Sequence, residues 1–372
     1  MENSTKVFDV IVVGAGPGGS MAAQAAADYG LSTCLLEKET LAEGGRYKAC
    51  GGALDWKIVK EINYPEEKIE RIIDSLELHH VDGEIYSKKG KGAVVWRSTF
   101  DKYLADIAVE SGAILKENES LIAIEKVADF YKIMTNKNKY ITKYVICADG
   151  VSSPTLKRLQ WGSFARENII LTITQEMALS KSKIDGFLGR NTIHLFFGIR
   201  KLIPVGYAWL FPKKEIITVG WGNQLTLVTN VREEHQKFLN LPFVTETLRH
   251  AQLNRFKAHL IPVGLRSKLY KEKVFAVGDA GGFVDPISGK GIPFAMMSGT
   301  IAIDTIIKSE NRDKPDNMGS YYESTLDKKF LQILKAKRPA RDRIFQKDET
   351  LKKFLALWEK YRSSEIVMRQ LI

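Results

Sequence analysis

The chain has 372 residues, which is too long for one core of ordinary size and predicts two lobes. Hydrophobic residues at 44% and aromatic residues at 10% mark a globular protein, and no window approaches the run of about 20 apolar residues that a membrane span needs. The net charge of +11 favours an anionic partner, which could be nucleic acid, a phospholipid surface or a phosphorylated substrate. Three cysteines without a CxxC pair argue against a disulfide framework or a zinc site, and no metal is expected.

The N-terminal segment predicts a βαβ unit that binds a dinucleotide. Residues 7–13, VFDVIVV, are typical of a buried parallel strand, and a glycine turn, an alanine-rich helix and a second strand ending at Glu37 follow. Because the strand enters the glycine turn directly, we interpret this segment as structure and not as a signal peptide, and expect a cytoplasmic protein. The three glycines of the G-x-G-x-x-G spacing allow a tight turn, close approach to a pyrophosphate and close helix packing, with the phosphates at the helix N-terminus. The residues expected to contact the dinucleotide here are Gly14, Ala15, Gly16, Pro17, Gly18, Gly19, Glu37 and Lys38.

The later segments predict an α/β fold interrupted by a second lobe. A helix over residues 96–112, capped by Ser98 or Thr99, and a buried strand over 144–149 continue the α/β pattern. Short alternating strands between residues 169 and 260 predict an antiparallel sheet with one wet face. The expected fold is therefore a Rossmann-like FAD-binding domain (1–78, 97–165 and 261–308) with an inserted antiparallel-sheet substrate domain (79–96 and 166–260). Residues 309–372 are expected to form a helical C-terminal region.

Three further motifs resemble those of the flavoproteins related to p-hydroxybenzoate hydroxylase. VGDA at 277–280 followed by PISGKGI at 286–292 resembles their second FAD fingerprint, and two others resemble their R-x-x-F/L-D and D-G motifs. The resemblance implies that Asp279 holds a ribityl hydroxyl and that the turn before residue 292 brings a helix N-terminus to the flavin pyrimidine. This fits because a reduced flavin carries negative charge at that end. FAD is thus the expected cofactor, and its further expected contacts are Arg97, Asp101, Ile122, Asp149, Gly150, Gly278, Asp279, Pro286, Gly289, Gly291 and Ile292.

Two other motifs resemble signatures of the geranylgeranyl reductases, FAD enzymes that saturate isoprenoid double bonds. YKACGGA at 47–53 resembles their K-x-C-G-G element, and YAWLFP at 207–212 resembles their Y-x-W-x-F-P element. The resemblance runs from Val7 to about Ile307 and is strongest to the archaeal enzymes that act on phospholipids. It implies a prenylated lipid substrate, no nucleic acid partner, and an external electron donor, for which NADPH, a ferredoxin and a deazaflavin remain open.

The same resemblance assigns roles to both elements. Cys50, Gly51 and Gly52 are expected next to the flavin, with Cys50 as the catalytic candidate, although it could pack, supply a proton or tune the flavin. Tyr207, Trp209, Phe211 and Pro212 are expected to contact the prenyl chain. On pattern alone, the aromatic stripe favours a core strand, whose alternate residues share one face, and only the family resemblance reverses this preference.

Other interpretations remain open at this stage. Aromatic hydroxylases and flavin halogenases share the FAD motifs, so a monooxygenase or halogenase of the same fold is the first alternative, and a non-catalytic flavin-bearing lipid-binding protein is the second. The segment Lys328–Arg343 holds seven Lys or Arg and one Asp with apolar residues at helical spacing. Such a helix could lie peripherally on an anionic membrane at the inner face, or could pack on the body with a solvated basic face.

Overall fold

The structure, a computed structural model, describes residues 6–42, 45–311 and 317–361. The chain forms two compact units, each built from three segments. Unit 1 comprises Met1–Tyr47, Ser98–Ala165 and Pro262–Lys335, and unit 2 comprises Lys48–Arg97, Arg166–Ile261 and Ala336–Ile372. Among the helices described, none is both long and apolar enough to cross a bilayer.

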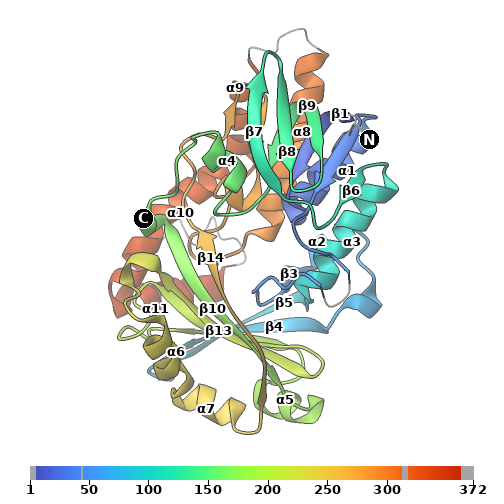
Figure 1. Ribbon diagram of the computed structural model, residues 1–372. Coiled ribbons are helices and arrows are strands. Elements are labelled where there is room, and N and C mark those ends of the chain that lie inside the picture. Colours follow the sequence, from blue (N-terminus) through green and yellow to red (C-terminus); the bar gives the residue numbers. More distant parts are fainter. Residues whose placement is uncertain (1–5, 43–44, 312–316, 362–372) are drawn as a thin grey trace. The chain divides into compact units, whose positions relative to one another are not determined.

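Unit 1 is an α/β unit built on an eight-stranded sheet (Figure 1). Its strands are β1 (Lys6–Val13), β2 (Thr33–Leu36), β6 (Ile114–Lys116), β7 (Leu121–Val127), β8 (Phe130–Thr135), β9 (Lys139–Cys147), β15 (Tyr270–Lys271) and β16 (Val274–Ala276). The main order is β15-β16-β9-β1-β2-β6, with β7 and β8 attached to β9. The pairs between β16, β9, β1, β2 and β6 are parallel. Its helices are α1 (Pro17–Asp28), α3 (Arg97–Glu110, from Ser98 on), α4 (Pro154–Arg158), α8 (Ile292–Glu310) and α9 (Met318–Leu326), with the 3-10 turn η4 (Gly278–Ala280).

The predicted elements of unit 1 are confirmed, with one change at α3. β1, β2 and β16 are buried for most of their length, as their apolar sequences predict, since parallel strands are covered on both faces. The predicted strand at residues 144–149 is the end of the longer β9. α3 begins at Arg97, so Ser98 and Thr99 lie inside its first turn and do not cap it. The prediction of the cap was wrong because the helix starts two residues earlier than a Ser98 cap and three residues earlier than a Thr99 cap would require.

Helices α1 and α8 pack through their backbones. A Cβ on Gly18 would lie 2.9 Å from the carbonyl oxygen of Ala295, and a Cβ on Gly299 would overlap the carbonyl oxygen of Gly18. Only glycine allows this approach at both positions. The first turn of α1 therefore lies directly against α8 between Ala295 and Gly299.

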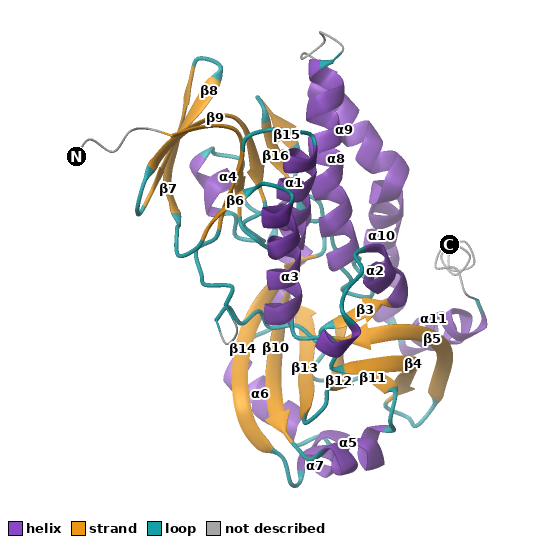
Figure 2. Cartoon of the chain, turned by 90° about the vertical axis from the view of Figure 1, so that its right-hand side faces the viewer, coloured by secondary structure: helices purple, strands orange, loops and turns teal. Residues whose placement is uncertain are grey.

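Unit 2 is built on a second eight-stranded sheet, of order β14-β10-β13-β12-β11-β4-β5-β3. Its strands are β3 (Ala53–Asp55), β4 (Arg71–His80), β5 (Ile85–Val94), β10 (Ile169–Ala178), β11 (Thr192–Phe197), β12 (Gly206–Pro212), β13 (Ile216–Gln224) and β14 (Gln252–Pro262). Its short helices are α2 (Trp56–Glu61), η1 (Glu66–Lys68), η2 (Arg166–Asn168), α5 (Lys181–Leu188), η3 (Leu225–Leu227), α6 (Val231–Leu239), α7 (Pro242–Leu248) and α11 (Asp348–Lys360). Figure 2 shows α5, α6 and α7 near the same sheet, and their side chains share one core with β10, β12 and β13.

This sheet differs from the predicted one in two respects. First, β11 pairs with β4 in parallel. The other pairs, β10 with β13, β13 with β12 and β12 with β11, are antiparallel as predicted. The expected wet face is also absent from the centre, because β10 and β13 are buried at nearly every residue. The helices cover one face, and large side chains of the sheet fill the other: the ring of Trp209 lies where a Cβ on Gly220 would be.

The basic segment near the C-terminus packs on the body of the protein. It forms a π-helical turn, Asp327–Leu331, and then α10 (Gln332–Gln346). Phe330, Leu331 and Leu334 belong to the core of unit 1, whereas Ile333 is exposed, so most of the large apolar residues that would enter a membrane are buried. Arg341, 1% exposed, donates to the Gln224 side chain in unit 2 at 3.0 Å. Of the two interpretations left open, the geometry favours a packed helix with a solvated basic face.

Candidate functional site

The glycine turn of unit 1 is folded tightly between β1 and β9. Gly14 has a φ of +102°, and a Cβ there would lie 2.5 Å from the carbonyl oxygen of Ala148. A Cβ on Gly19 would overlap the carbonyl oxygen of Gly14, so the helix can approach the strand only with glycine at this position. Gly16 caps α1 in an extended conformation and offers no side chain to its first turn. Gly14 therefore makes the tight turn and Gly19 allows the close helix packing that the motif predicts, while the approach of a pyrophosphate to Gly16 stays a prediction.

Glu37 fastens this turn from the end of β2. Its side chain is 4% exposed, and its Oε2 accepts from the backbone N–H of Ala15 at 2.9 Å. Oε2 also accepts from Arg46 Nη1 at 3.1 Å, and Arg46 Nη2 lies 3.3 Å from Asp101 Oδ2 on α3. The Arg46 guanidinium thus joins the glycine turn, Glu37 and Asp101 into one charged cluster.

Arg46 is a site residue that sequence reasoning missed. Its Nη2 is the nearest atom to a Cβ placed on Gly16, at 3.6 Å, so the cation lies over the turn where phosphates of a dinucleotide are expected. The sequence around it, GGRYK, carries no motif that would separate Arg46 from the chain's many other basic residues. Only the fold brings it to the turn.

The second turn precedes α8. Gly278 has a φ of +56°, and its N–H donates to Ser298 Oγ at 3.0 Å. Asp279 Oδ1 lies 3.7 Å from the position of a Cβ on Gly291, the residue that caps α8. Asp279 and the α8 N-terminus are therefore close together, as the flavoprotein resemblance implies.

The PISGKG turn is shaped by a residue that sequence reasoning did not single out. Asp285 is buried, and its Oδ1 accepts from the backbone N–H groups of Ile287 and Ser288 at 2.9 and 3.0 Å. Its own N–H donates to the Lys290 carbonyl, which closes the turn around Gly289. An Asp before a Pro is an ordinary turn signal, and that signal could have identified Asp285.

Asp149 follows β9, but its carboxylate is used locally. Oδ1 accepts from Ser153 Oγ at 2.5 Å and Oδ2 accepts from the backbone N–H of Thr155 at 2.8 Å. Burial raises the pKa of Asp149 above its ordinary value, although these two bonds act in the opposite direction. Gly150, at a φ of +83°, makes the turn that brings Asp149 to the start of α4.

The other expected cofactor contacts fall at different places. Pro17 is the first residue of α1, and Ile292 is the first residue of α8. Lys38 is largely exposed beside Glu39. Ile122 lies on β7, which the strands β8 and β9 separate from β1. Arg97 is buried and begins α3, and it belongs to unit 2.

The K-x-C-G-G element lies in unit 2 and packs on the Y-x-W-x-F-P strand. A Cβ on Gly51 would overlap the ring of Phe211, and a Cβ on Gly52 would overlap the carbonyl oxygen of Val95. Gly52 has a φ of +81°, and its N–H lies 3.4 Å from the half-buried Cys50 Sγ. Two segments that are far apart in the sequence, and that were singled out separately, thus form one structure.

The stripe of β12 alternates as predicted. Ala208 and Leu210 face the core beneath α5, α6 and α7. Tyr207, Trp209 and Phe211 lie on the other face, where the strand register places them opposite Gly222, Gly220 and Thr218 of β13. Two buried polar atoms on this face have no hydrogen-bond partner among the described residues, Trp209 Nε1 and Thr174 Oγ1. The face therefore combines aromatic rings and glycines with buried polar side chains, among them Thr174, Glu176 and Thr218.

A buried lysine at the end of β12 was also missed. Lys213 is 1% exposed; its ammonium lies 3.5 Å from Glu176 Oε2 and 4.1 Å from the centre of the Trp96 ring. It also contacts Thr218 Oγ1, which donates to Glu176 Oε2 at 2.6 Å. Burial lowers the pKa of Lys213, while Glu176 and, next in size, Cys50 act to raise it. Lys213 therefore connects the K-x-C-G-G element electrostatically to the interior of the sheet.

Known proteins resemble the chain over most of its length. It is 32% identical over 336 residues to a digeranylgeranylglycerophospholipid reductase of Methanococcus vannielii, covering 88% of this chain and 84% of the relative. It is 32% identical over 326 residues to the protein of that name from Methanocaldococcus jannaschii, covering 83% and 79%. The family model for glucose inhibited division protein A matches residues 9–178.

The fold resembles solved flavoprotein structures. A geranylgeranyl bacteriochlorophyll reductase-like protein of Thermoplasma acidophilum aligns with a TM-score of 0.84 at 24% identity, covering 99% of this chain and 96% of that one. A flavin-dependent brominase aligns with a TM-score of 0.72 at 16% identity, covering 87% and 84%. These likenesses confirm the predicted fold class, which reductases and halogenases share.

Proposed function

The chain belongs to the digeranylgeranylglycerophospholipid reductase family, and from this premise we propose that it saturates the C=C bonds of geranylgeranyl chains in archaeal-type membrane lipids with FAD as its cofactor. One observation carries the proposal most directly. The K-x-C-G-G and Y-x-W-x-F-P elements pack on each other, with Gly51 beneath the ring of Phe211. Each element alone is a short sequence pattern, but both are signatures of the same family, and their contact in the structure supports a common role.

The residues of unit 1 fit FAD. The N-terminus of α1 at Gly16 supplies free N–H groups for the pyrophosphate, and Arg46 adds a cation beside them. We propose that Glu37 accepts from ribose hydroxyls and that Asp279 and the N-terminus of α8 hold the ribityl and pyrimidine end; the contact of Glu37 with the glycine turn and the proximity of Asp279 to Gly291 support this. When bound and reduced, FAD supplies the hydride for a C=C bond, and a proton completes the saturated product.

For the substrate, we propose that the prenyl chain lies along Tyr207, Trp209 and Phe211, with Pro212 at the end of the strand. A polyprenyl chain offers no hydrogen bonds, so its site needs apolar walls. The three aromatic rings supply apolar surface on the face opposite the helices of unit 2, where Gly222 and Gly220 lie opposite Tyr207 and Trp209.

Cys50 is the residue that we propose acts beside the reacting double bond. Replacing it with alanine or serine is expected to lower prenyl reduction by about 100-fold, within the range that a lost proton donor causes. Bound FAD is expected to stay unchanged, because the glycine turn does not contain Cys50. Turnover per bound FAD and the flavin absorbance of the purified variants check this. Cys34→Ala, in the core beside β1, is the control and should keep its turnover per FAD. Full turnover in both Cys50 variants would contradict the assignment.

The partners follow from the same function. An external electron donor must reduce the flavin, and NADPH, a ferredoxin and a deazaflavin all suit the chemistry. We also propose peripheral contact with an anionic membrane surface at its cytoplasmic side. The exposed cations Lys328, Lys329 and Arg343 support electrostatic contact, since Phe330, Leu331 and Leu334 of that segment are buried.

An anaerobic assay distinguishes the proposed reaction from the alternatives. The protein, reduced with dithionite and given a digeranylgeranylglyceryl phospholipid without oxygen, is expected to yield a lipid that gains two hydrogens for each double bond, detected by mass spectrometry. A hydroxylase or halogenase needs oxygen to form a flavin hydroperoxide and would give no product. A lipid-binding protein without activity would return the substrate unchanged under either condition.

A further inference from the structure

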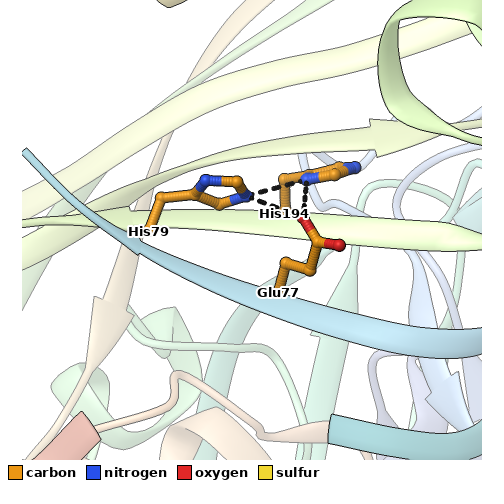
Figure 3. Close-up of side chains that lie close together, drawn as sticks. All are labelled: Glu77, His79 and His194. Carbon is orange, nitrogen blue, oxygen red and sulfur yellow. Dashed lines mark hydrogen bonds and ion pairs between the residues drawn. The ribbon is translucent and has the colours of Figure 1, made fainter. Parts of the chain in front are cut away.

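Three metal-ligating side chains converge in unit 2, away from the residues discussed above. Glu77 and His79 lie on β4, and His194 lies on β11, in the parallel pair of strands (Figure 3). His79 Nε2 and His194 Nδ1 are 3.0 Å apart. Glu77 Oε2 is 3.2 Å from the first nitrogen and 3.3 Å from the second. The three atoms therefore form a nearly equilateral triangle.

The size of this triangle suits a transition metal ion. Zn²⁺ binds His nitrogen and carboxylate oxygen at about 2.0–2.2 Å, and a tetrahedral or octahedral arrangement at that radius separates neighbouring ligand atoms by roughly 3.0–3.5 Å. Two imidazoles with one carboxylate are a donor set that zinc and its neighbours in the periodic table accept. No ligand atom has to move far to reach a common ion.

The hydrogen bonds around the triangle leave lone pairs facing inward. His194 Nε2 lies 2.8 Å from the carbonyl oxygen of Leu188, which can only accept, so Nε2 carries the proton and Nδ1 of the neutral ring presents a lone pair. That lone pair faces the Glu77 carboxylate oxygen at 3.3 Å. A proton on His79 Nε2 can satisfy one of the two acceptors well, whereas a cation satisfies all three atoms together.

The surroundings fix the ligands as they do in metal sites. The bond to the Leu188 carbonyl orients the His194 ring, which is the usual role of an outer partner of a metal-bound histidine. Phe196 stacks on the His79 ring, with ring centres 4.6 Å apart, and Phe243 of α7 stacks on Phe196. The Glu77 side chain remains 30% exposed, so a water molecule can reach the remaining coordination position.

The triangle is separate from the proposed prenyl face. His194 lies opposite Leu210 in the register of β11 and β12, and Leu210 faces the core beneath the helices. Trp209 and its neighbours lie on the other side of the sheet. An ion at the triangle would therefore fasten β4 to β11 without touching the proposed substrate surface.

We propose that Glu77, His79 and His194 bind a divalent transition metal ion of the zinc class, with water as a further ligand, and that this ion stabilises the β4–β11 pairing. From the sequence, no metal is expected because the cysteines lack the spacing of a zinc site, but this site contains no cysteine. His79 and His194 are 115 positions apart, so no local motif relates them.

Metal titration of the full chain, purified without a polyhistidine tag and treated with a chelator, tests the proposal. Calorimetry should show one Zn²⁺ ion bound tightly per chain. Co²⁺ should give the visible absorption of a low-coordinate site, and bound Zn²⁺ should raise the Tm of the protein. Glu77→Gln and His194→Gln should each weaken the tight equivalent by at least 10-fold. His250→Gln, at an exposed position after α7, is the matched control and should bind as the parent chain does.

The outcomes separate cleanly. Loss of the tight equivalent in Glu77→Gln, a half-buried position whose replacement leaves the ring bond to Leu188 intact, supports the site even if His194→Gln fails to fold. No stoichiometric binding of Zn²⁺ or Co²⁺ to the parent chain, or equal affinity in Glu77→Gln, would overturn it and leave a hydrogen-bonded histidine pair. None of these measurements depends on flavin or on turnover, so they stand apart from the test of the reductase.

Discussion

Replacing Glu176 with glutamine is expected to lower the free energy of unfolding by about 3–5 kcal/mol, because it leaves the ammonium of Lys213 buried without its carboxylate. Both side chains are 1% exposed, so water cannot take over the lost interaction. Denaturant unfolding followed by tryptophan fluorescence measures the change. The double variant Glu176→Gln, Lys213→Met should recover most of the loss, since removing both charges also removes the cost of burying them.

A pH series sharpens this prediction. Burial lowers the pKa of Lys213 in the folded protein, so between that value and the higher pKa of the unfolded chain the unfolded chain binds more protons. The free energy of unfolding therefore rises with pH across this window. Glu176 acts to raise the pKa of Lys213, so its removal should extend the window to lower pH and enlarge the total gain in the free energy of unfolding. Glu233→Gln, which breaks the exposed pair with Lys237, should cost less than about 1 kcal/mol. An equally small loss in Glu176→Gln would contradict the buried pair.

Replacing Glu37 with alanine is expected to lower FAD affinity by about 100-fold or more. The substitution removes the acceptor for Ala15 N–H and leaves Arg46 without one of its two carboxylate partners, and bonds to charged groups contribute about 1.5–3 kcal/mol each. It also removes the acceptor proposed for the ribose hydroxyls. The flavin-to-protein ratio after purification and a fluorescence titration with FAD measure the effect.

The neighbouring Glu39 offers a matched control for this change. Glu39 is a surface carboxylate paired with Lys38, and only its backbone N–H reaches Glu37. Glu39→Gln should therefore bind FAD as the parent chain does. Glu37→Gln keeps one acceptor oxygen and should fall between the two. Parental affinity in Glu37→Ala would mean that FAD does not use this end of β2.

The sequence predicts the α/β unit well because its signals are local. The run before Gly14, the glycine spacing and Glu37 all lie within one βαβ unit, and close backbone approaches require glycine at positions 14 and 19. The strands between residues 169 and 260 are confirmed for the same reason, since alternation is a local property. The parallel pairing of β11 with β4 joins residues more than 100 positions apart, and no pattern in either strand predicts it.

Apart from Asp285, which a local turn signal could have identified, the parts of the candidate site that escaped prediction depend on tertiary contacts. Arg46 and Lys213 are ordinary basic residues in the sequence, and only the fold places one over a glycine turn and buries the other beside Glu176. The packing of Gly51 on Phe211 joins two motifs that the sequence presents as independent. Burial of the basic helix was equally hidden, because the same apolar spacing serves a membrane or a protein core.

The backbone contact between α1 and α8 has a further consequence for cofactor length. Gly18 and Gly299 bring the two helices together without any side chain between them, and the first turns meet at Ala295. In the proposed site one helix N-terminus receives the pyrophosphate and the other receives the ring end, so the distance between these two anchors is set by main-chain geometry. The backbone contact between the two helices therefore fixes the length of the dinucleotide that the proposed site accepts, and this length does not depend on side-chain contacts between the helices.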